Sequence, residues 1–412
     1  MQRRGFFQRV AVTATLLSPV AAPTEARSQA AGGAPAGAEP LDTLLRPHLA
    51  SYGLPALAAA VVREGRVVAA GAVGTRRAGA DIPVTLEDRF HIGSDTKAMT
   101  ALLAAMQVEA GRLRWDGTLG ESFPDLAAGM DAGLRRVTLA QLLSHSSGVP
   151  SDNPAFLDLV MQSYTASGDD HLNLDELRMW LVRQWSTQPL AAEPGTRFAY
   201  ANMNYVLAGA MIERAAGRTW EELIVERVFE PLGLHTAGFG PQAQPGRVDA
   251  PLGHAVRADG TLKPLLAGPD GDGPMVVGPA GLVHLSVLDF AAWAGWNAGE
   301  GRRGPALVRP ETLRLLHAQH IAIPPRPDAA PGTPREGGGY GFGWGVARLD
   351  YAPEPFLLHS GSNTLNLAMI MLQPAQDFAM VMVTNVGGRR AEATLAVVAE
   401  ALGSRFGAAR PG

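Results

Sequence analysis

The sequence predicts a mixed α/β (α+β) protein in which one mainly antiparallel sheet carries helices and receives a helical lobe as an insertion. Strand-like runs lie near both ends of the chain, within 57–73 and 341–384, whereas residues 112–240 are mostly helical in spacing. The two end regions are therefore expected to share one sheet. With 412 residues, 46% hydrophobic and 18% charged, the chain is long enough for one broad core or two joined lobes.

The N-terminal part supplies a helix, a hairpin and a second helix. Residues 41–52 have helical spacing, and the β-rich runs 57–62 and 66–73 are separated by a short turn that is typical of a hairpin. The next helix follows Gly93 and ends at Gly111. Its buried face recurs every three or four residues, at Met99, Leu102, Leu103 and Met106.

The remaining elements follow in order. In the middle, 205–216 and 219–228 are the clearest helices, and 240–280 is a Gly/Pro/Asp-rich loop of the length that usually covers or lines a site. After a surface loop at 321–339, four strands are expected, the last two joined by a turn: Gly341–Leu349, Pro355–His359, Leu365–Leu372 and Phe378–Thr384. An amphipathic helix, 389–405, closes the pattern.

These elements divide the chain into regions. Within one domain, 41–405, residues 41–111 and 275–405 form the sheet lobe and 112–274 the helical lobe, with a flexible lead-in at 31–40 and a tail at 406–412. A cleft between the lobes is the expected place for a ligand. Loops 150–175 and 240–280 are expected to set its specificity.

Residues 1–30 have the pattern of an export signal. A basic start with adjacent Arg3 and Arg4 precedes a modestly apolar stretch, and Ser28-Gln29-Ala30 is the expected cleavage site. The paired arginines followed by Gly5-Phe6-Phe7 resemble a twin-arginine signal, with an ordinary Sec signal as the alternative. Either route predicts a periplasmic or secreted protein.

The composition argues against several classes of function. The net charge of −4, without a basic block or a basic and aromatic stripe, argues against nucleic-acid binding. Because there is no cysteine, disulfides, thiolate nucleophiles and Cys-ligated metals are excluded. Nothing after the N-terminus is apolar for long enough to span a bilayer, so no stable membrane anchor is expected after signal cleavage.

The first chemical motif is Ser94-Asp95-Thr96-Lys97. Three residues make nearly one helical turn, so Ser94 and Lys97 project from the same face, at a helix N-terminus that favours developing negative charge. A serine hydroxyl needs an adjacent base to act as a nucleophile. The alternative is a helix-capping serine with a chance surface lysine.

Lysine scarcity sharpens this motif. Of the 35 Lys and Arg residues only two are lysines, Lys97 and Lys263. Arginine cannot lose its proton in a protein, whereas a partly buried lysine can. A proton acceptor at position 97 therefore has to be lysine, while a merely positive surface residue does not.

Two further motifs carry polar groups. Tyr200-Ala201-Asn202 precedes a helix, and a nearby Lys97 ammonium is expected to favour the Tyr200 anion as a general base, while Asn202 offers an amide to substrate and lysine. His359-Ser360-Gly361-Ser362 ends a strand, where Gly361 allows close approach and the N–H groups of Ser362 and Ser94 can form an oxyanion hole. The alternatives are a buried tyrosine with an Asn cap, and a strand-end turn with a satisfied histidine.

Together, in this order, the motifs resemble the serine β-lactamase and penicillin-binding-protein superfamily, most closely its class C-like branch with D-Ala-D-Ala carboxypeptidases and esterases. The resemblance covers about 41–405 and includes the phrases 141–148, 231–234 and 279–282. It implies a three-layer αβα sandwich plus a helical domain and no cofactor. It implies the following site: Ser94 as nucleophile, Lys97 as its activating neighbour, Tyr200 as base and then acid, Asn202 positioning substrate, and His359 with Gly361 and Ser362 on the strand edge.

One departure from the family pattern concerns substrate. Many β-lactamases have Lys-Thr/Ser-Gly where this chain has His359, and a histidine is mostly neutral at pH 7. Losing one charge-assisted hydrogen bond costs about 1.5–3 kcal/mol, so β-lactam hydrolysis is expected to be at most secondary.

Other residues are set aside. His145 is expected to be structural, and Asp95 to cap or solvate the helix start. Asp270-Gly271-Asp272-Gly273 lacks the further ligands of a Ca²⁺ loop. No metal is expected, because these histidines lack ligand spacing with nearby carboxylates: His91, His254, His284, His317 and His320.

The sequence thus predicts a serine hydrolase that forms an acyl-enzyme on Ser94 and cleaves small-molecule esters or amides, D-Ala-type peptides or β-lactams among them. The rival hypothesis is a penicillin-recognising binding or sensing protein that is acylated but turns over poorly. The sequence does not fix the substrate or the oligomeric state.

Overall fold

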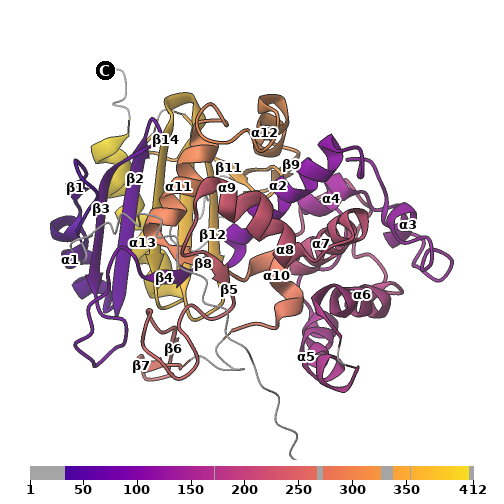
Figure 1. Ribbon diagram of the computed structural model, residues 1–412, viewed down its shortest axis with the longest axis horizontal. Helices are drawn as coiled ribbons and strands as arrows, with labels where there is room; N and C mark the ends of the chain where they lie inside the picture. Colours follow the sequence, from indigo (N-terminus) through magenta and orange to yellow (C-terminus); the bar gives the residue numbers. More distant parts are fainter. Residues whose placement is uncertain (1–32, 171, 267–271, 326–336, 353, 408–412) are drawn as a thin grey trace, which may run out of the picture. The chain divides into compact units, whose positions relative to one another are not determined.

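A nine-stranded sheet organises the protein (Figure 1). The computed structural model describes residues 33–170, 172–266, 272–325, 337–352 and 354–407. The strand order is β1-β3-β2-β14-β13-β12-β11-β10-β9, and every neighbouring pair is antiparallel except β1 with β3. The strands are β1 (Glu39–Pro40), β2 (Ala56–Arg63), β3 (Arg66–Gly74), β9 (Ile321–Ile323), β10 (Gly338–Tyr340), β11 (Gly345–Ala347), β12 (Phe356–Ser362), β13 (Leu367–Gln373) and β14 (Phe378–Thr384).

The N- and C-terminal strands meet in the centre of this sheet, where β2 pairs with β14 from Leu57 to Arg63. The two-residue turn that joins β2 to β3 uses positive φ angles at Glu64 and Gly65, as tight hairpins require. The predicted shared sheet is therefore confirmed, and it brings residues from opposite ends of the chain into register.

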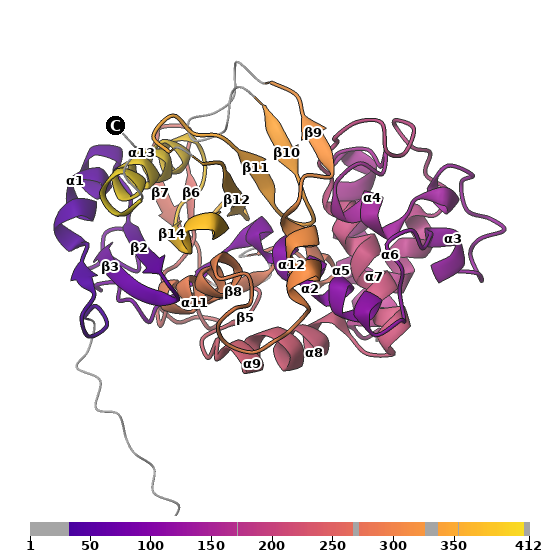
Figure 2. The same cartoon turned by 90° about the horizontal axis from the view of Figure 1, so that it is seen from above.

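Helices cover both faces of the sheet (Figure 2). Leu57, Ala59 and Val61 of β2 belong to the core under α1 (Asp42–Tyr52) and α13 (Arg389–Phe406). The alternate β2 residues Ala58, Ala60 and Val62 belong to the core on the opposite face, with α2 (Thr96–Glu109) and α11 (Val287–Ala298). Because successive side chains of a strand point to opposite faces, this alternation defines the predicted three-layer αβα sandwich.

The inserted middle region is helical up to residue 232. Four of its helices begin with a capping box, in which Thr118, Thr138, Asn173 and Thr219 exchange hydrogen bonds with the residue three positions on. The elements are α3 (Leu119–Ser122), α4 (Leu139–Leu143), α5 (Pro154–Asp170), α6 (Leu174–Trp185), α7 (Asn202–Ala216), α8 (Trp220–Ile224), a π-helical segment (Val225–Phe229) and α9 (Glu230–Leu232). The helix expected at 219–228 is thus α8 continued by the π-helical segment.

The region expected to be a long loop, 240–280, contains short regular elements. Three-residue strands β6 (His254–Val256) and β7 (Leu262–Pro264) form a hairpin, and α10 (Gly278–Gly281) follows a 3₁₀ turn. A second sheet, order β4-β8-β5, joins β4 (Arg89–His91), β8 (Val283–Ser286) and β5 (Gly238–Phe239). Residues 267–271 lie outside the described part of the chain.

Three expectations about local structure need correction. Of the strand expected at Gly341–Leu349 only Gly345–Ala347 (β11) forms, because the chain after β10 turns at Gly343, where φ is +83° and a Cβ would lie 2.6 Å from Ala98 Cα. The ends of the surface loop expected at 321–339 pair as β9 and β10, and 326–336 are not described. The lead-in ends in an edge strand, because Glu39–Pro40 pairs with Ala69–Ala70.

The last helix before the C-terminal strands is α12 (Pro310–His317). Within the described residues, no helix combines the length and apolarity needed to cross a bilayer.

Candidate active site

Ser94 lies in the short connection between β4 and α2. This connection is a 3₁₀ turn, Gly93–Asp95, and the α-helix proper begins at Thr96. Ser94 is therefore not the N-cap of α2, which is the role that the alternative interpretation gave it, and its side chain makes no capping bond. The turn leaves the hydroxyl at the pocket edge with an orientation fixed by the start of α2.

Lys97 reaches back to Ser94 and is fully buried. Its Nζ donates to Ser94 Oγ at 3.0 Å, to Asn202 Oδ1 at 2.7 Å and to the Ala280 carbonyl at 2.6 Å. All three acceptors are uncharged, and no carboxylate is in direct contact with Nζ among its described partners. The predicted pairing of Ser94 with Lys97 on one face is what the structure shows.

This environment changes the acidity of the amine. Burial lowers the pKa of Lys97 from 10.5 to about 7, and the carboxylates of Asp152 and Asp95 only partly oppose it. Near pH 7 a substantial share of the molecules therefore carries a neutral amine, with a lone pair beside the Ser94 hydroxyl. A neutral amine at this distance can accept the serine proton.

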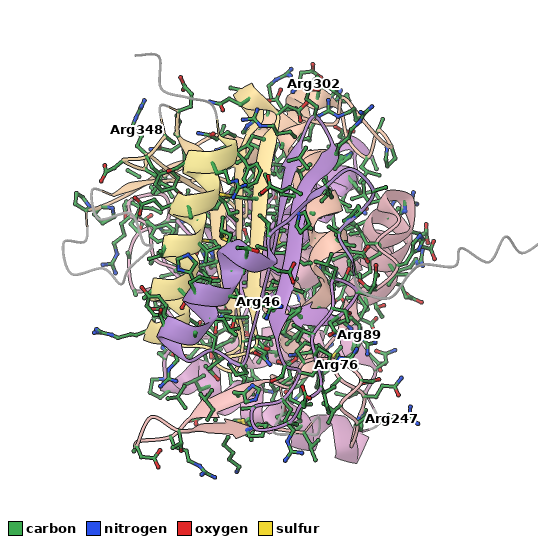
Figure 3. The ribbon with its side chains drawn as sticks, turned by 90° about the vertical axis from the view of Figure 1, so that its left-hand side faces the viewer. Arg46, Arg76, Arg89, Arg247, Arg302 and Arg348 are labelled. Carbon is green, nitrogen blue, oxygen red and sulfur yellow. The ribbon has the colours of Figure 1, made fainter. Side chains whose placement is uncertain are left out.

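The other lysine and the arginines labelled in Figure 3 are less buried than Lys97. Figure 3 labels Arg46, Arg76, Arg89, Arg247, Arg302 and Arg348, of which Arg76 and Arg89 are half-buried and the other four are exposed. Lys263, the other lysine, is exposed in β7. Among these side chains only Lys97 is fully buried, whereas Lys263 and four of the six arginines are exposed.

The Tyr200 ring lies next to the Lys97 amine, and its hydroxyl contacts Ser94. Its phenol hydrogen-bonds Ser94, and the Lys97 Nζ lies 4.8 Å from its ring centroid. Burial raises the pKa of Tyr200, and Asp152 and Asp95 raise it further. The expectation that Lys97 stabilises the Tyr200 anion is therefore wrong, because burial outweighs the hydrogen bond from Ser94. Tyr200 therefore keeps its proton near neutral pH, whereas Lys97 has a pKa of about 7.

Asn202 accepts a hydrogen bond from the Lys97 amine and is itself held by Asp152, a residue that the sequence did not indicate. The Asn202 backbone N–H donates to Asp152 Oδ1 at 2.9 Å, and its side-chain Nδ2 donates to Asp152 Oδ2 at 2.5 Å. Asp152 thereby caps α7 and orients the Asn202 carbonyl oxygen toward Lys97. The two positions are 50 residues apart, so no local spacing could have revealed the contact.

The two expected oxyanion donors come from adjoining segments. A Cβ on Gly361 would lie 2.5 Å from Ser94 N and would overlap with the Ile92 carbonyl, and one on Gly93 would overlap with Ser362 N. Because Gly361 and Gly93 have no side chains, β12 can lie against the turn Gly93–Asp95. Ser94 and Ser362 consequently line the same cavity.

His359 is neutral and buried beside this turn. Burial and Lys97 lower its pKa to about 3. Its Nδ1 lies 3.0 Å from the Ser360 carbonyl and therefore carries the proton, while Nε2 accepts from the Tyr340 hydroxyl at 3.0 Å. His359 thus provides no positive charge to the pocket.

Asp95 departs from its expected role. It is 1% exposed and makes no capping bond, and His359 Nδ1 lies 3.3 Å from its Oδ1. Burial raises the pKa of Asp95 well above its usual range, against the opposing effect of Lys97. Because a tertiary contact buries it, its place beside the helix start gave no sign of this.

The His145 ring packs against the Tyr200 ring. It is fully buried, its ring centroid lies 4.2 Å from that of Tyr200, and its Nδ1 lies 3.1 Å from Asn204 Nδ2. Burial, Lys97 and His359 lower its pKa well below the usual value. It is a neutral packing group, as expected, and not the base.

A cavity of about 430 Å³ opens over Ser94. Besides the motif residues, its described lining is largely apolar or glycine, and it contains neither lysine nor arginine. The lining residues are Ser94, Phe198, Tyr200, Asn202, Ile323, Gly337, Gly338, Gly339, Tyr340, Gly345, Val346, Ala347, Leu358, His359, Ser360 and Ser362.

The described part of the chain offers no cluster of metal ligands. No three His, Cys, Asp or Glu side chains in the described ranges gather into a group that could hold a metal ion. Asp270 and Gly271 of the rejected Ca²⁺ loop lie outside those ranges. His91, expected to lack a nearby carboxylate, has one through space, because its Nε2 lies 3.0 Å from Asp272 Oδ2.

A serine hydroxyl, a partly neutral amine and a phenol that share one pocket on an αβα sandwich define the class of Ser-x-x-Lys hydrolases. The Beta-lactamase family model matches residues 41–403. The chain therefore belongs to the beta-lactamase family and is a serine hydrolase of that superfamily, which confirms the predicted resemblance.

Individual relatives differ in what their names describe. The chain is 27% identical over 317 residues to penicillin-binding protein 4 of Amycolatopsis lactamdurans, covering 77% of each chain. It is 32% identical over 202 residues to the lovastatin esterase of Penicillium rubens, covering 45% of this chain and 49% of the esterase. The octameric penicillin-binding protein homologue from Pyrococcus abyssi has a similar structure, with a TM-score of 0.69, 26% identity, and coverage of 88% of this chain and 77% of that one.

Proposed function

We propose that the protein hydrolyses uncharged esters through an acyl-enzyme on Ser94. Ser94 Oγ adds to the ester carbonyl carbon while neutral Lys97 takes the hydroxyl proton. The tetrahedral oxyanion is held by the N–H groups of Ser94 and Ser362. The carbon–oxygen bond to the alcohol then breaks, the alcohol leaves with a proton donated by Tyr200, and Lys97 returns its proton to Tyr200. In the second half-reaction water adds to the acyl carbonyl carbon and gives a proton to Lys97. The carbon–oxygen bond to Ser94 breaks, Ser94 Oγ takes up a proton from Tyr200, Lys97 returns its proton to Tyr200, and the carboxylic acid leaves.

One observation carries this proposal. The Lys97 amine lies 3.0 Å from Ser94 Oγ, is fully buried, and has a pKa lowered to about 7. A group that exchanges a proton near the working pH, within hydrogen-bond reach of the nucleophile, meets both requirements for a general base.

The pocket supports esters over carboxylate-bearing substrates. Penicillins and D-Ala peptides carry a carboxylate that needs a cationic partner, whereas His359 is neutral and the described lining offers no lysine or arginine. Phe198, Ile323 and Leu358 instead present apolar surface. The missing charge-assisted bond disfavours an anionic substrate by about 1.5–3 kcal/mol, or roughly 10- to 150-fold. The likeness to a lovastatin esterase agrees with this choice.

The direct test uses p-nitrophenyl butyrate and a fluorophosphonate probe. The wild-type protein is expected to hydrolyse the ester and to be labelled at Ser94. Ser94→Ala should lose both properties while its melting temperature stays nearly the same, because the variant loses only the hydroxyl contacts with Lys97 and Tyr200 at the edge of the cavity. Ester hydrolysis retained by Ser94→Ala would overturn the proposal.

The rival function is slow acylation by penicillins without useful turnover. The likeness to penicillin-binding protein 4 favours it. A fluorescent penicillin adduct that persists for hours, together with negligible ester turnover, would establish the rival and remove the esterase.

We also propose that the protein acts outside the cytoplasm as a periplasmic or secreted enzyme. The support is the basic and apolar pattern of residues 1–30. Expression of the full chain in a bacterium, followed by fractionation, is expected to find the protein outside the cytoplasm. Replacing Arg3 and Arg4 by lysine should retain it inside if the twin-arginine route is used, and leave export intact if the Sec route is used.

A further inference from the structure

A buried contact between His91 and Asp272 links the loop after residue 271 to β4, the strand that precedes Ser94. His91 Nε2 lies 3.0 Å from Asp272 Oδ2, and the side chains are 0% and 3% exposed. On the other side of the ring, His91 Nδ1 accepts from the Gly93 N–H at 3.0 Å. Because Nδ1 accepts, Nε2 carries the proton, and this N–H lies 3.0 Å from Asp272 Oδ2. The loop carboxylate thus acts on the backbone next to Ser94 through one imidazole.

The same carboxylate also bonds the segment that follows the second oxyanion donor. Asn363 Nδ2 donates to Asp272 Oδ1 at 3.1 Å, and the Gly273 N–H donates to the same oxygen at 2.8 Å. Asn363 directly follows Ser362, and its own Oδ1 accepts from Leu365 N at 3.2 Å. Asp272 therefore holds the end of β12 as well as the turn after β4.

The charge of Asp272 agrees with this double contact. Burial alone raises the pKa of Asp272, but His91, Asn363 and the Gly273 N–H outweigh it, so the net pKa is lower than usual. A carboxylate that stays ionised in a buried place makes stronger hydrogen bonds than a neutral group does.

We propose that Asp272 is a positioning residue for the oxyanion hole, because it ties together the two chain segments that supply the Ser94 and Ser362 N–H donors. It acts through His91 and Asn363 and does not contact Ser94 itself. Oxyanion donors must lie about 2.7–3.1 Å from the developing charge, and these two come from segments far apart in the sequence. A carboxylate bonded to both segments fixes their separation. This inference rests on the proposed acyl transfer.

The test compares Asp272→Asn with the wild-type enzyme on p-nitrophenyl butyrate. The introduced amide keeps one acceptor oxygen, but its NH2 group cannot accept, so it cannot present an acceptor oxygen to both His91 and Asn363 as the carboxylate does. We expect kcat to fall about 10- to 100-fold, since small misplacements of catalytic donors cost up to about 100-fold in rate. KM should stay within about twofold, and the acid limb of the pH profile should not move, because Lys97 is untouched.

Asp131→Asn is the matched control. Asp131 Oδ1 also accepts two loop N–H groups, those of Gly133 and Leu134, each at 2.9 Å, and Asp131 is not among the residues that line the cavity over Ser94. This variant should keep the wild-type kcat. If Asp272→Asn does not fold, Asn363→Ala breaks the same link from its other side and should show the same loss of kcat with unchanged KM.

A second readout does not depend on activity. Hydrogen–deuterium exchange of Asp272→Asn is expected to accelerate in both 91–96 and 361–366, and that of Asp131→Asn in neither. Unchanged kcat in Asp272→Asn, or faster exchange in only one of the two segments, would overturn the inference. An inactive wild-type enzyme would instead refute the proposed function, and the exchange experiment would still decide whether Asp272 joins the two segments.

Discussion

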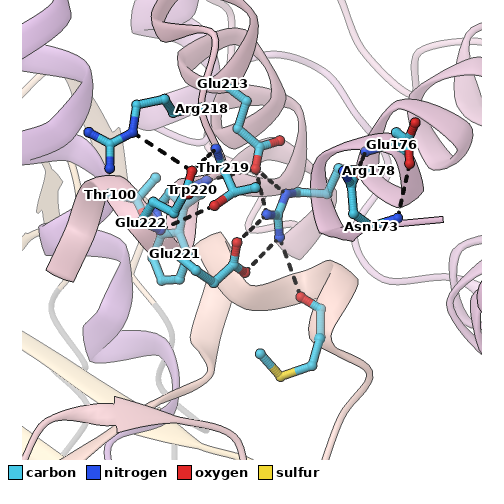
Figure 4. Close-up of polar contacts among 11 residues, drawn as sticks. Thr100, Asn173, Glu176, Arg178, Glu213, Arg218, Thr219, Trp220, Glu221 and Glu222 are labelled. Atoms are coloured by element: carbon cyan, nitrogen blue, oxygen red, sulfur yellow. Dashed lines mark hydrogen bonds and ion pairs between the residues drawn. The ribbon is translucent and has the colours of Figure 1, made fainter. Parts of the chain in front are cut away.

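Two buried cations in this protein have opposite surroundings. Lys97 and Arg178 are both 0% exposed. Among the described residues, Lys97 donates to uncharged oxygens, those of Ser94, Asn202 and Ala280, and its pKa is lowered to about 7. Arg178 lies between two carboxylates (Figure 4), and its pKa is raised although burial by itself lowers it.

The Arg178 cluster has the geometry of a structural tie. Its Nε donates to Glu213 Oε1 at 2.8 Å, its Nη1 to Glu221 Oε1 at 3.0 Å, and its Nη2 to both carboxylates at 2.5 Å. These residues join α6, α7 and α8, and a weaker contact of 3.4 Å reaches the Met275 carbonyl ahead of α10. Burial raises the pKa of Glu213, partly offset by Arg178.

The difference shows how the partners of a buried cation set the direction of its pKa shift. An arginine surrounded by carboxylates remains a fixed charge and stabilises the packing of three helices, provided that all partners are present. A lysine buried against neutral acceptors is close to losing its proton and destabilises the fold at neutral pH. The first arrangement suits a structural ion pair, and the second suits the proton transfer that we propose for Lys97.

The largest expected effect comes from Lys97→Arg. It keeps a positive charge at position 97 but removes the ability to give up a proton, so the comparison predicts a loss of about 100- to 10,000-fold in kcat/KM for p-nitrophenyl butyrate. Lys263→Arg is the control in the same chain and should match the wild type. Comparable activity of the two variants would show that charge alone is enough.

Arg178→Met should act on stability and not on chemistry. It leaves Glu213 and Glu221 buried without their cation, which is expected to cost about 3–5 kcal/mol of unfolding free energy. Denaturant unfolding measures that loss, and kcat per active site, counted by fluorophosphonate labelling, should stay within a few-fold of the wild type. A loss of kcat with unchanged stability would contradict the distinction between the two cations.

Lys97→Met should affect stability in the opposite direction to Arg178→Met, and with a particular pH dependence. Folding lowers the pKa of Lys97 from 10.5 to about 7, so the folded state binds fewer protons than the unfolded state between these values. As the pH falls from 10.5 toward 7, the unfolded state therefore gains stability from its extra proton. Below pH 7 the loss of unfolding free energy caused by the buried amine is complete. The melting temperature of Lys97→Met relative to the wild type should be most favourable below pH 7 and decline above it. A pH-independent difference would contradict the lowered pKa.

Asp152→Asn should give the smallest effect. The Asp152 carboxylate raises the pKa of Lys97, so its removal should lower that pKa and shift the acid limb of kcat/KM toward lower pH. The sign follows because Lys97 acts in its neutral form, and activity rises as it loses its proton. A shift toward higher pH would mean that another group controls the limb.

The sequence predicted those parts of the site that depend on local spacing. Ser94 and Lys97 lie one turn apart, and the shared sheet follows from strand patterns at both ends of the chain, so both were accessible without coordinates. The direction of the Tyr200 pKa was predicted wrongly, because burial is a property of the whole fold. Asp152 and Asp272 act through residues that are distant in sequence, and neither carries a local signal.

The Arg178 cluster shows the same limit. One arginine among many gave no reason to single it out, whereas lysine scarcity marked Lys97. Composition was informative only where a residue type was nearly absent.

The most direct test of the account is an NMR titration of lysine ε-carbons in protein labelled with ¹³C-lysine. The chain has only two lysines, so two signals are expected, and Lys97→Arg assigns them. The account predicts that the Lys97 signal titrates near pH 7 and that the midpoint matches the acid limb of ester hydrolysis. A Lys97 signal that stays in its protonated position above about pH 9 would contradict the claim that this amine is the base.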